Sequence, residues 1–153
     1  MNKEKALEKL LKCRANIISD AIAVEIALDW TIRLYFFPKT NHRASAFHAL
    51  ILDSQSFGFD KKISLFENIG YFKRLKHYAK IKQALRSIQR FRNAVAHWSY
   101  YEIKKNKEEI VLHRVDYTKE IVLNARTVAE FLTDVNFVVK AFGFPNSQDN
   151  WEF

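Results

Sequence analysis

The N-terminal part of the chain has apolar residues at the spacing of an amphipathic helix. Between Lys3 and Phe37 they recur every three or four positions, and Pro38 ends the pattern. The apolar positions of this predicted long helix are Leu7, Leu10, Leu11, Ile17, Ile18, Ala21, Ile22, Leu28 and Ile32. Three charged residues interrupt its most apolar stretch, namely Glu25, Asp29 and Arg33. A bilayer span needs about 20 consecutive apolar residues, so we expect a core helix and no membrane segment.

Two shorter helices are predicted next. Asn41 is a residue type that caps helix N-termini, and the apolar positions after it predict a helix to about Leu52. Ser54 to Phe59 is a predicted loop. Asp60 can then cap a third helix, whose apolar positions are Ile63, Leu65, Phe66 and Ile69. Gly70 is placed to end this helix.

The apolar period changes after a fourth helix, which is predicted from about Leu75 to Trp98. Tyr101 to Ile103 and Ile110 to Val115 are short β-prone runs on either side of the polar segment K-K-N-K-E-E. This arrangement predicts a hairpin with a long turn. Ile121 to Leu123 is suited to a third short strand.

A last helix is predicted from Ala125 to Phe142, capped by Asn124 and closed by Gly143 and Pro145. The predicted fold is therefore mainly α: an up-and-down helical bundle of four to five helices, with a small β-hairpin inserted before the C-terminal helix. We expect a single domain over residues 1–153. The bundle occupies about 1–100, the hairpin about 100–123 and the C-terminal helix about 124–143.

Composition supports one compact domain. A chain of 153 residues with 48% hydrophobic residues can bury roughly two thirds of its unfolded surface. Its one cysteine, Cys13, excludes an internal disulfide framework, and the first residues lack a signal-peptide pattern. We therefore expect a cytoplasmic protein.

The positive charge is concentrated in one segment. Residues 68–101 contain no acidic residue but include Lys73, Arg74, Lys76, Lys80, Lys82, Arg86, Arg90 and Arg92. The other 17 basic residues are matched by the 17 acidic ones, so the formal charge of +8 lies in this segment. Such a block is typical of a surface that binds a polyanion, although a solvated helix face that aids solubility has the same composition.

The fourth helix has two distinct sides at 100° per residue. Its predicted apolar side consists of Ile81, Ala84, Leu85, Ile88, Phe91 and Val95. A polar stripe on the opposite side consists of Arg86, Arg90, Asn93 and His97. Guanidinium groups match phosphate oxygens, and a neutral imidazole can take up a proton near pH 7. The stripe therefore suits a phosphodiester.

Arg92 departs from that stripe. It projects about 40° from Ile88, on the apolar side, where an uncompensated charge is costly. Three interpretations are open. Arg92 reaches the edge of the core with its guanidinium in water, it pairs with a carboxylate such as Glu25 or Asp29, or the end of the helix lies in a cleft shared with another subunit.

The segment R-N-A-V-A-H at residues 92–97 resembles the signature of the HEPN superfamily. That signature is an arginine followed by a polar residue, and then a histidine after four to six intervening positions, late in a helix of a helical bundle. Arg92, Asn93 and His97 match it. Arg90 is also within range of His97, but Phe91 follows it, so Arg90 fits better as a supporting phosphate contact. The resemblance covers about residues 1–100.

The resemblance implies a homodimer whose facing motif helices form one composite cleft, and a metal-independent endoribonuclease of toxin–antitoxin or other defence systems. It implies attack of a ribose 2′-hydroxyl on the adjacent phosphate. His97 would be the general base or acid, Arg92 would stabilise phosphoryl charge, and Asn93 would orient the histidine or the phosphate. Basic residues expected to contact RNA are Lys76, Lys80, Lys82, Arg86 and Arg90. Glu25 and Asp29 are the candidate supporting carboxylates.

Other interpretations of the motif remain open. The same residues would serve a HEPN-like domain that binds nucleic acid or a protein without cutting, and His97 could simply cap its own helix. A purely structural helical adaptor is a third class. We expect no cofactor and no metal site, because His42 and His48 are six residues apart and do not share a helix face. Expected partners are RNA, a second copy of the chain and an antitoxin protein.

Overall fold

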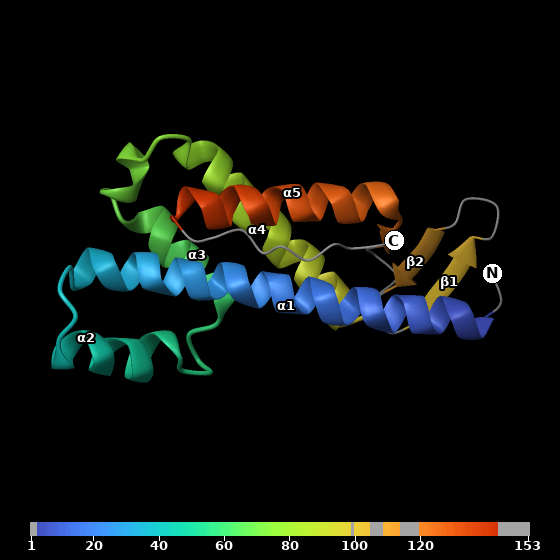
Figure 1. Ribbon diagram of the computed structural model, residues 1–153, viewed down its shortest axis with the longest axis horizontal. Helices are drawn as coiled ribbons and strands as arrows, with labels where there is room; N and C mark the ends of the chain where they lie inside the picture. Colours follow the sequence, from blue (N-terminus) through green and yellow to red (C-terminus); the bar gives the residue numbers. More distant parts are fainter. Residues whose placement is uncertain (1–2, 99, 105–108, 114–119, 144–153) are drawn as a thin grey trace.

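A single long helix, α1 (Lys3–Phe36), spans almost the whole long axis of the molecule (Figure 1). The computed structural model describes residues 3–98, 100–104, 109–113 and 120–143. The buried side of α1 carries Leu10, Ile17, Val24, Leu28 and Ile32, which are all fully buried at helical spacing. The prediction of one long core helix is therefore confirmed.

A short helical segment lies on one side of α1. It consists of α2 (His42–Phe47) and a π-helical turn, η1 (His48–Leu52). Asn41 is the N-cap as predicted, because its Oδ1 accepts a hydrogen bond from the backbone N–H of Ala44 at 2.9 Å. In Figure 1, α2 lies on the side of α1 opposite to α4 and α5.

Helix α3 (Phe59–Asn68) begins one residue before the predicted cap. Gly58 is the N-cap, so the prediction that Asp60 caps this helix is wrong. Asp60 is the second helical residue, and its carboxylate accepts hydrogen bonds from α4 instead. The helix ends at Asn68 with Ile69 as its C-cap, so Gly70 lies just past the end of the helix as predicted, but it has no positive φ and does not form a left-handed cap.

A 3₁₀ turn, η2 (Phe72–Arg74), precedes helix α4 (Tyr78–Ala96). Helix α4 starts three residues later than predicted because His77 at its N-cap has a left-handed backbone, with φ of 64°. The predicted apolar side is confirmed. Ile81, Ala84, Leu85, Ile88 and Val95 are buried, and Phe91 stacks on Phe131 of α5 with 5.2 Å between the ring centroids.

The chain after α4 forms a three-stranded antiparallel sheet in the order β1-β2-β3. Its strands are β1 (Tyr100–Lys104), β2 (Glu109–His113) and β3 (Glu120–Leu123). Tyr101 pairs with Leu112, and Ile110 pairs with Leu123. The third strand completes a sheet where a hairpin was the main expectation. The predicted second strand extended to Val115, which lies outside the described residues.

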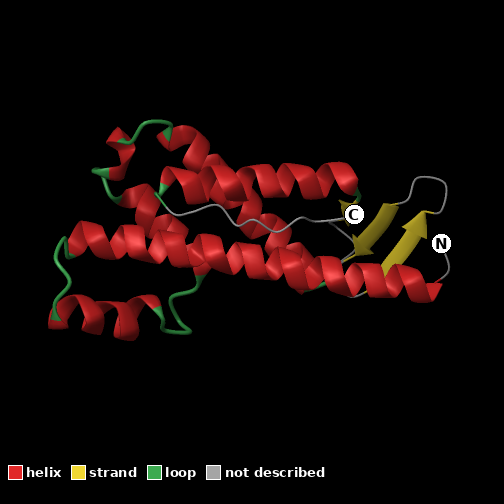
Figure 2. Cartoon of the chain, viewed as in Figure 1, coloured by secondary structure: helices red, strands yellow, loops and turns green. Residues whose placement is uncertain are grey.

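Helix α5 (Ala125–Ala141) closes the core against α1 and α4. Asn124 caps it as predicted, and Thr127 returns the contact through its hydroxyl, which forms a capping box. Gly143, with φ of 78°, follows the helix, and Pro145 lies outside the described residues. Most of the described chain is helical, with one small sheet (Figure 2), so the prediction of a mainly α fold is confirmed.

The directions of the helices determine where the R-N-A-V-A-H segment lies. Helices α1 and α5 both start at the sheet end of the molecule, and α4 runs the opposite way and ends there (Figure 1). The C-terminus of α4 is therefore packed against the N-terminal half of α1, next to the sheet.

Candidate functional site

The candidate site begins where α4 ends. Ala96 is the last helical residue, and His97 is the C-cap, with φ of −118° and ψ of 23°. The backbone N–H of His97 donates to the carbonyl of Asn93 at 3.1 Å, and its side chain is exposed. The helix is thus terminated by the backbone of His97, which leaves the imidazole at the surface beside the negative end of the helix dipole.

Arg92 is half-buried and is oriented by its neighbour in the sequence. Its Nη1 donates to Oδ1 of Asn93 at 2.9 Å, and Asn93 is itself half-buried. The side chain of Arg92 leaves the apolar side of α4 and turns toward the polar side. Asn93 therefore holds the guanidinium on the side of the helix that also carries the exposed Arg90 and His97.

A second guanidinium reaches the same helix end from α1. Nη2 of Arg14 donates to the carbonyl of Ala96 at 3.1 Å, across 82 residues of sequence. This contact satisfies one of the carbonyls that a helix C-terminus leaves without an intrahelical donor. Arg14 was missed by the sequence analysis. Its only sequence signal is its place one residue after the buried Cys13, which does not reveal the partner across the bundle.

The expected supporting carboxylates are engaged elsewhere. Glu25 and Asp29 lie in the C-terminal half of α1, and both form ion pairs with Lys62 of α3, with N–O distances of 2.7 Å. The end of α4 packs on the N-terminal half of α1, through Arg14. Neither carboxylate is therefore the partner of Arg92, and that interpretation is wrong for this chain.

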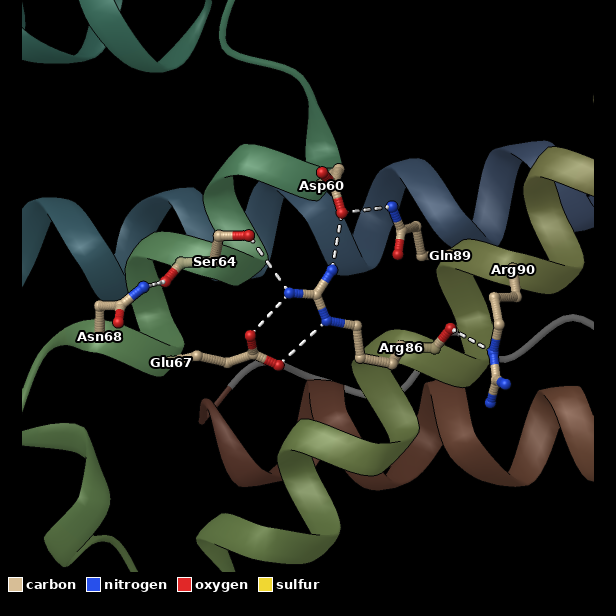
Figure 3. Close-up of polar contacts among 7 residues, drawn as sticks. All are labelled: Asp60, Ser64, Glu67, Asn68, Arg86, Gln89 and Arg90. Atoms are coloured by element: carbon tan, nitrogen blue, oxygen red, sulfur yellow. Dashed lines mark hydrogen bonds and ion pairs between the residues drawn. The ribbon is translucent and has the colours of Figure 1, made fainter.

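Contacts with α3 separate Arg86 from the other residues of the predicted polar stripe. Figure 3 shows the guanidinium of Arg86 directed at α3, where Nε and Nη2 bind the two carboxylate oxygens of Glu67 at 3.0 and 2.6 Å. Nη1 binds Asp60 at 2.6 Å, and Nη2 also contacts the hydroxyl of Ser64. All three nitrogens have protein partners, so Arg86 joins α4 to α3 and is not available to phosphate without breaking these bonds.

These contacts shift the protonation equilibria of both acids. The hydrogen bond from Arg86 lowers the pKa of Glu67, and hydrogen bonds from Gln89 and Arg86 lower the pKa of Asp60. The pKa of Arg86 is raised, mainly by its hydrogen bond with Glu67. The network is therefore fully ionised at neutral pH and acts as an electrostatic clamp between two helices.

The other predicted RNA contacts are exposed. Lys76, Lys80, Lys82 and Arg90 all have exposed side chains. Lys76 precedes α4, and Lys80 lies over the ring of Phe137 at 4.5 Å from the centroid. Arg90 is in Figure 3 beside the clamp but outside it, with Nε directed at the carbonyl of Arg86 at 3.3 Å. These four side chains can approach a phosphate backbone.

The end of α4 therefore combines an exposed imidazole with two guanidinium groups held by protein oxygens. Within the described ranges, no helix is both long and apolar enough to cross a membrane. No three histidine, cysteine, aspartate or glutamate side chains in the same ranges are grouped to hold a metal ion. The guanidinium groups at the end of α4 can bind an anion, and the imidazole can transfer protons.

Comparison with known proteins gives no relative: no family model, curated protein or solved structure matches the chain. The function of the chain must therefore be inferred from the residues and contacts at the end of α4.

Proposed function

We propose that the protein is a metal-independent endoribonuclease of the HEPN toxin or defence type. The observation that carries this proposal is the end of α4, where Asn93 orients the guanidinium of Arg92 and His97 exposes its imidazole. Arg14 brings a second guanidinium to this helix end. A phosphodiester needs cationic donors for its oxygens and a group that transfers protons, and these side chains supply both.

The proposed reaction is an internal transfer within the RNA. The ribose 2′-oxygen attacks the adjacent phosphorus, the bond from phosphorus to the 5′-oxygen breaks, and the products are a 2′,3′-cyclic phosphate and a 5′-hydroxyl. His97 takes the proton from the 2′-hydroxyl or gives one to the leaving 5′-oxygen. Arg92 stabilises the charge that develops on the non-bridging oxygens. Asn93 acts through Arg92, whose guanidinium it positions.

The proposal places this chemistry at a composite cleft of a homodimer. The step needs one proton acceptor and one proton donor at the same phosphate, and a single imidazole cannot be both at once. Two copies of His97, one from each subunit, divide these roles. The half-buried Arg92, which Asn93 turns toward the polar side of α4, then faces the same cleft in both subunits.

RNA is held in this proposal by the exposed basic side chains of the same segment, Lys76, Lys80, Lys82 and Arg90. Each phosphate that they neutralise releases counterions, so affinity should fall steeply with added salt. Arg86 is left out of this surface because α3 occupies its guanidinium. We place the enzyme in the cytoplasm with an antitoxin protein as a partner, as the resemblance to HEPN toxins implies.

The test uses purified protein with mixed single-stranded and transfer RNA in EDTA, beside a His97→Ala variant. Wild-type protein should cleave, and the variant should lose a hundredfold or more of the rate, in the usual range for a general acid or base (about 10²- to 10⁴-fold). Cleavage by both proteins, or by neither, contradicts the proposed ribonuclease activity of His97. RNA binding without cleavage would favour a non-catalytic binding module. Light scattering should give about twice the 18.1 kDa mass of the chain.

A further inference from the structure

A second site with its own chemistry lies on the opposite half of α1. It is a cavity of about 330 Å³ between α1, the connection from η1 to α3, and α3 itself. Its wall includes Glu25 and Asp29 of α1, Asp53 of the connection and Lys62 of α3, together with the apolar Ile22 and Ile26. The residues of the candidate ribonuclease site are absent from this wall, so a ligand in this cavity is independent of the proposed function.

The charges in this wall do not balance. Lys62 pairs with both Glu25 and Asp29 at 2.7 Å, so one ammonium faces two carboxylates. Asp53 adds a third carboxylate, which lies 3.4 Å from Nε2 of His48. In a chain with a formal charge of +8, this is a local excess of negative charge. The excess is conspicuous because Lys62 and Asp29 are almost fully buried.

One carboxylate oxygen in the wall has no partner. Asp29 is 3% exposed, and its Oδ2 accepts from Lys62. Its other oxygen, Oδ1, has no hydrogen-bond donor among the described residues. A buried acceptor without a donor is costly, so the negative charge of Asp29 is only partly compensated by Lys62. Burial raises the pKa of Asp29 to about 6, which leaves this carboxylate mostly ionised at neutral pH.

The local backbone also departs from regular structure here. The π-helical turn η1 ends at Leu52, and both Leu52 and the next residue, Asp53, line the cavity. Single π-helical turns are frequent at functional sites, because the extra residue re-aims the side chains that come after it. In this chain Asp53 is the C-cap of that turn and lines the cavity.

We propose that this cavity binds an alkylammonium or alkylguanidinium group, as carried by a polyamine or by a lysine or arginine side chain. The N–H groups donate to the carboxylates of Glu25 and Asp53, and the aliphatic stem lies against Ile22 and Ile26. The buried carboxylate of Asp29 lies behind these groups and adds its negative charge to the attraction. Both isoleucines are exposed, at 45% and 49%, so they gain from being covered. A neutral ligand of the same shape satisfies the acceptors but not the excess charge.

The experiment is an amide NMR titration of the full chain with n-butylguanidinium, and with n-butylurea as its neutral isostere. Saturable shifts of the Asp29, Gln55 and Lys62 amides are expected with the cation, and at least tenfold weaker binding with the urea. Equal binding of both, or no saturable shift at these amides, overturns the proposal. These two arms use wild-type protein, so they do not depend on whether a variant folds.

Two variants test whether the negative charge of Asp29 contributes to binding of the cation. Asp29→Asn should weaken n-butylguanidinium binding at least tenfold, whereas Asp60→Asn, on the outer side of α3, should change it less than twofold. Equal affinity in wild type and Asp29→Asn contradicts the assignment. Lowering the pH from 7 to 5 should also weaken binding, because Asp29 takes up a proton. The other titratable groups around it are Glu25, His48, Asp53 and Lys62.

The source of the cation is distinguished by two further ligands. Spermidine represents a free polyamine, and N-acetylarginine amide represents a protein side chain. Tighter binding of one of them, at the same amides, identifies the natural source within the proposed chemistry. Failure of both to shift these amides at concentrations where n-butylguanidinium binds overturns the proposal.

Discussion

Nη1 of Arg92 donates a hydrogen bond to Oδ1 of the next residue, Asn93, over 2.9 Å. Two consecutive residues of a helix point about 100° apart, so this contact requires the long arginine side chain to bend toward the polar side of α4. The arginine that the sequence places on the apolar side is thus turned toward the exposed His97. In the proposed enzyme, Asn93 is a positioning residue and Arg92 contacts the phosphate.

Two substitutions of Asn93 test whether its side-chain oxygen positions Arg92. Asn93→Ala should lower kcat/KM for RNA about tenfold, because it releases the guanidinium. Asn93→Asp keeps an acceptor for Arg92 but adds a negative charge beside the phosphate, so it should lower kcat/KM further. Measuring kcat/KM for both variants across a salt series would show how much of the loss in Asn93→Asp is due to the added charge. Wild-type activity in Asn93→Asp would contradict a phosphate at this position.

Arg92 and Arg90 form a matched pair for a second prediction. Arg92→Lys should reduce kcat/KM at least tenfold, because an ammonium cannot donate to Asn93 and to two phosphoryl oxygens from one planar group. Arg90→Lys should change it less than about threefold, since an exposed phosphate contact depends mainly on charge. Circular dichroism checks that both fold. Equal losses in the two variants would contradict the distinct role of Arg92.

Because Arg86 joins α3 to α4, replacing it should lower the stability of the fold and should not remove a group that takes part in catalysis. Arg86→Gln should lower the free energy of unfolding by about 1–2 kcal/mol at pH 7, measured with urea. Arg90→Gln, one turn away, should change it by less than about 0.5 kcal/mol. Arg86 contributes to lowering the pKa values of Glu67 and Asp60, so its stabilisation is present above their unfolded values and lost as the pH falls through the lowered ones. A loss that persists at pH 2–3 would contradict the ion-pair explanation.

Asp29 should affect stability with the opposite pH dependence. Burial raises its pKa from 3.8 to about 6, so between these values the folded state holds a proton that the unfolded state has released. Stability therefore increases as the pH falls through 6. Relative to Asp29→Asn, the wild-type protein should gain about 1 kcal/mol between pH 7 and pH 5. Parallel profiles for the two proteins would show that Asp29 does not titrate in this range.

Local signals in the sequence were sufficient for much of the fold. Asn41 and Asn124 cap the helices that come after them, because a short side chain next to its own backbone needs no distant partner. Asp60 carries the same kind of signal but is drawn into contacts with Arg86 and Gln89. The late start of α4 depends on a left-handed His77, which is not a glycine and gives no such signal.

The candidate site was predictable only in part, for a similar reason. Arg92, Asn93 and His97 are close in sequence, so their spacing indicates that they act together. The approach of Arg14 to Ala96 and the pairing of Glu25 and Asp29 with Lys62 depend on which halves of α1 meet α3 and α4. Helical periodicity identifies a buried side but not the register between two helices. The division of the polar stripe by α3 has the same origin.

The most direct test of the proposed function is the chemistry of the RNA ends that the protein leaves. Wild-type protein in EDTA should produce fragments with a 2′,3′-cyclic phosphate and a 5′-hydroxyl, and His97→Ala should produce neither above background. His42→Ala, an exposed histidine far from α4 in the sequence, is the control and should match wild type. Fragments with a 5′-phosphate and a 3′-hydroxyl, or the same ends at the same rate from His97→Ala, would contradict cleavage by the 2′-hydroxyl at this site.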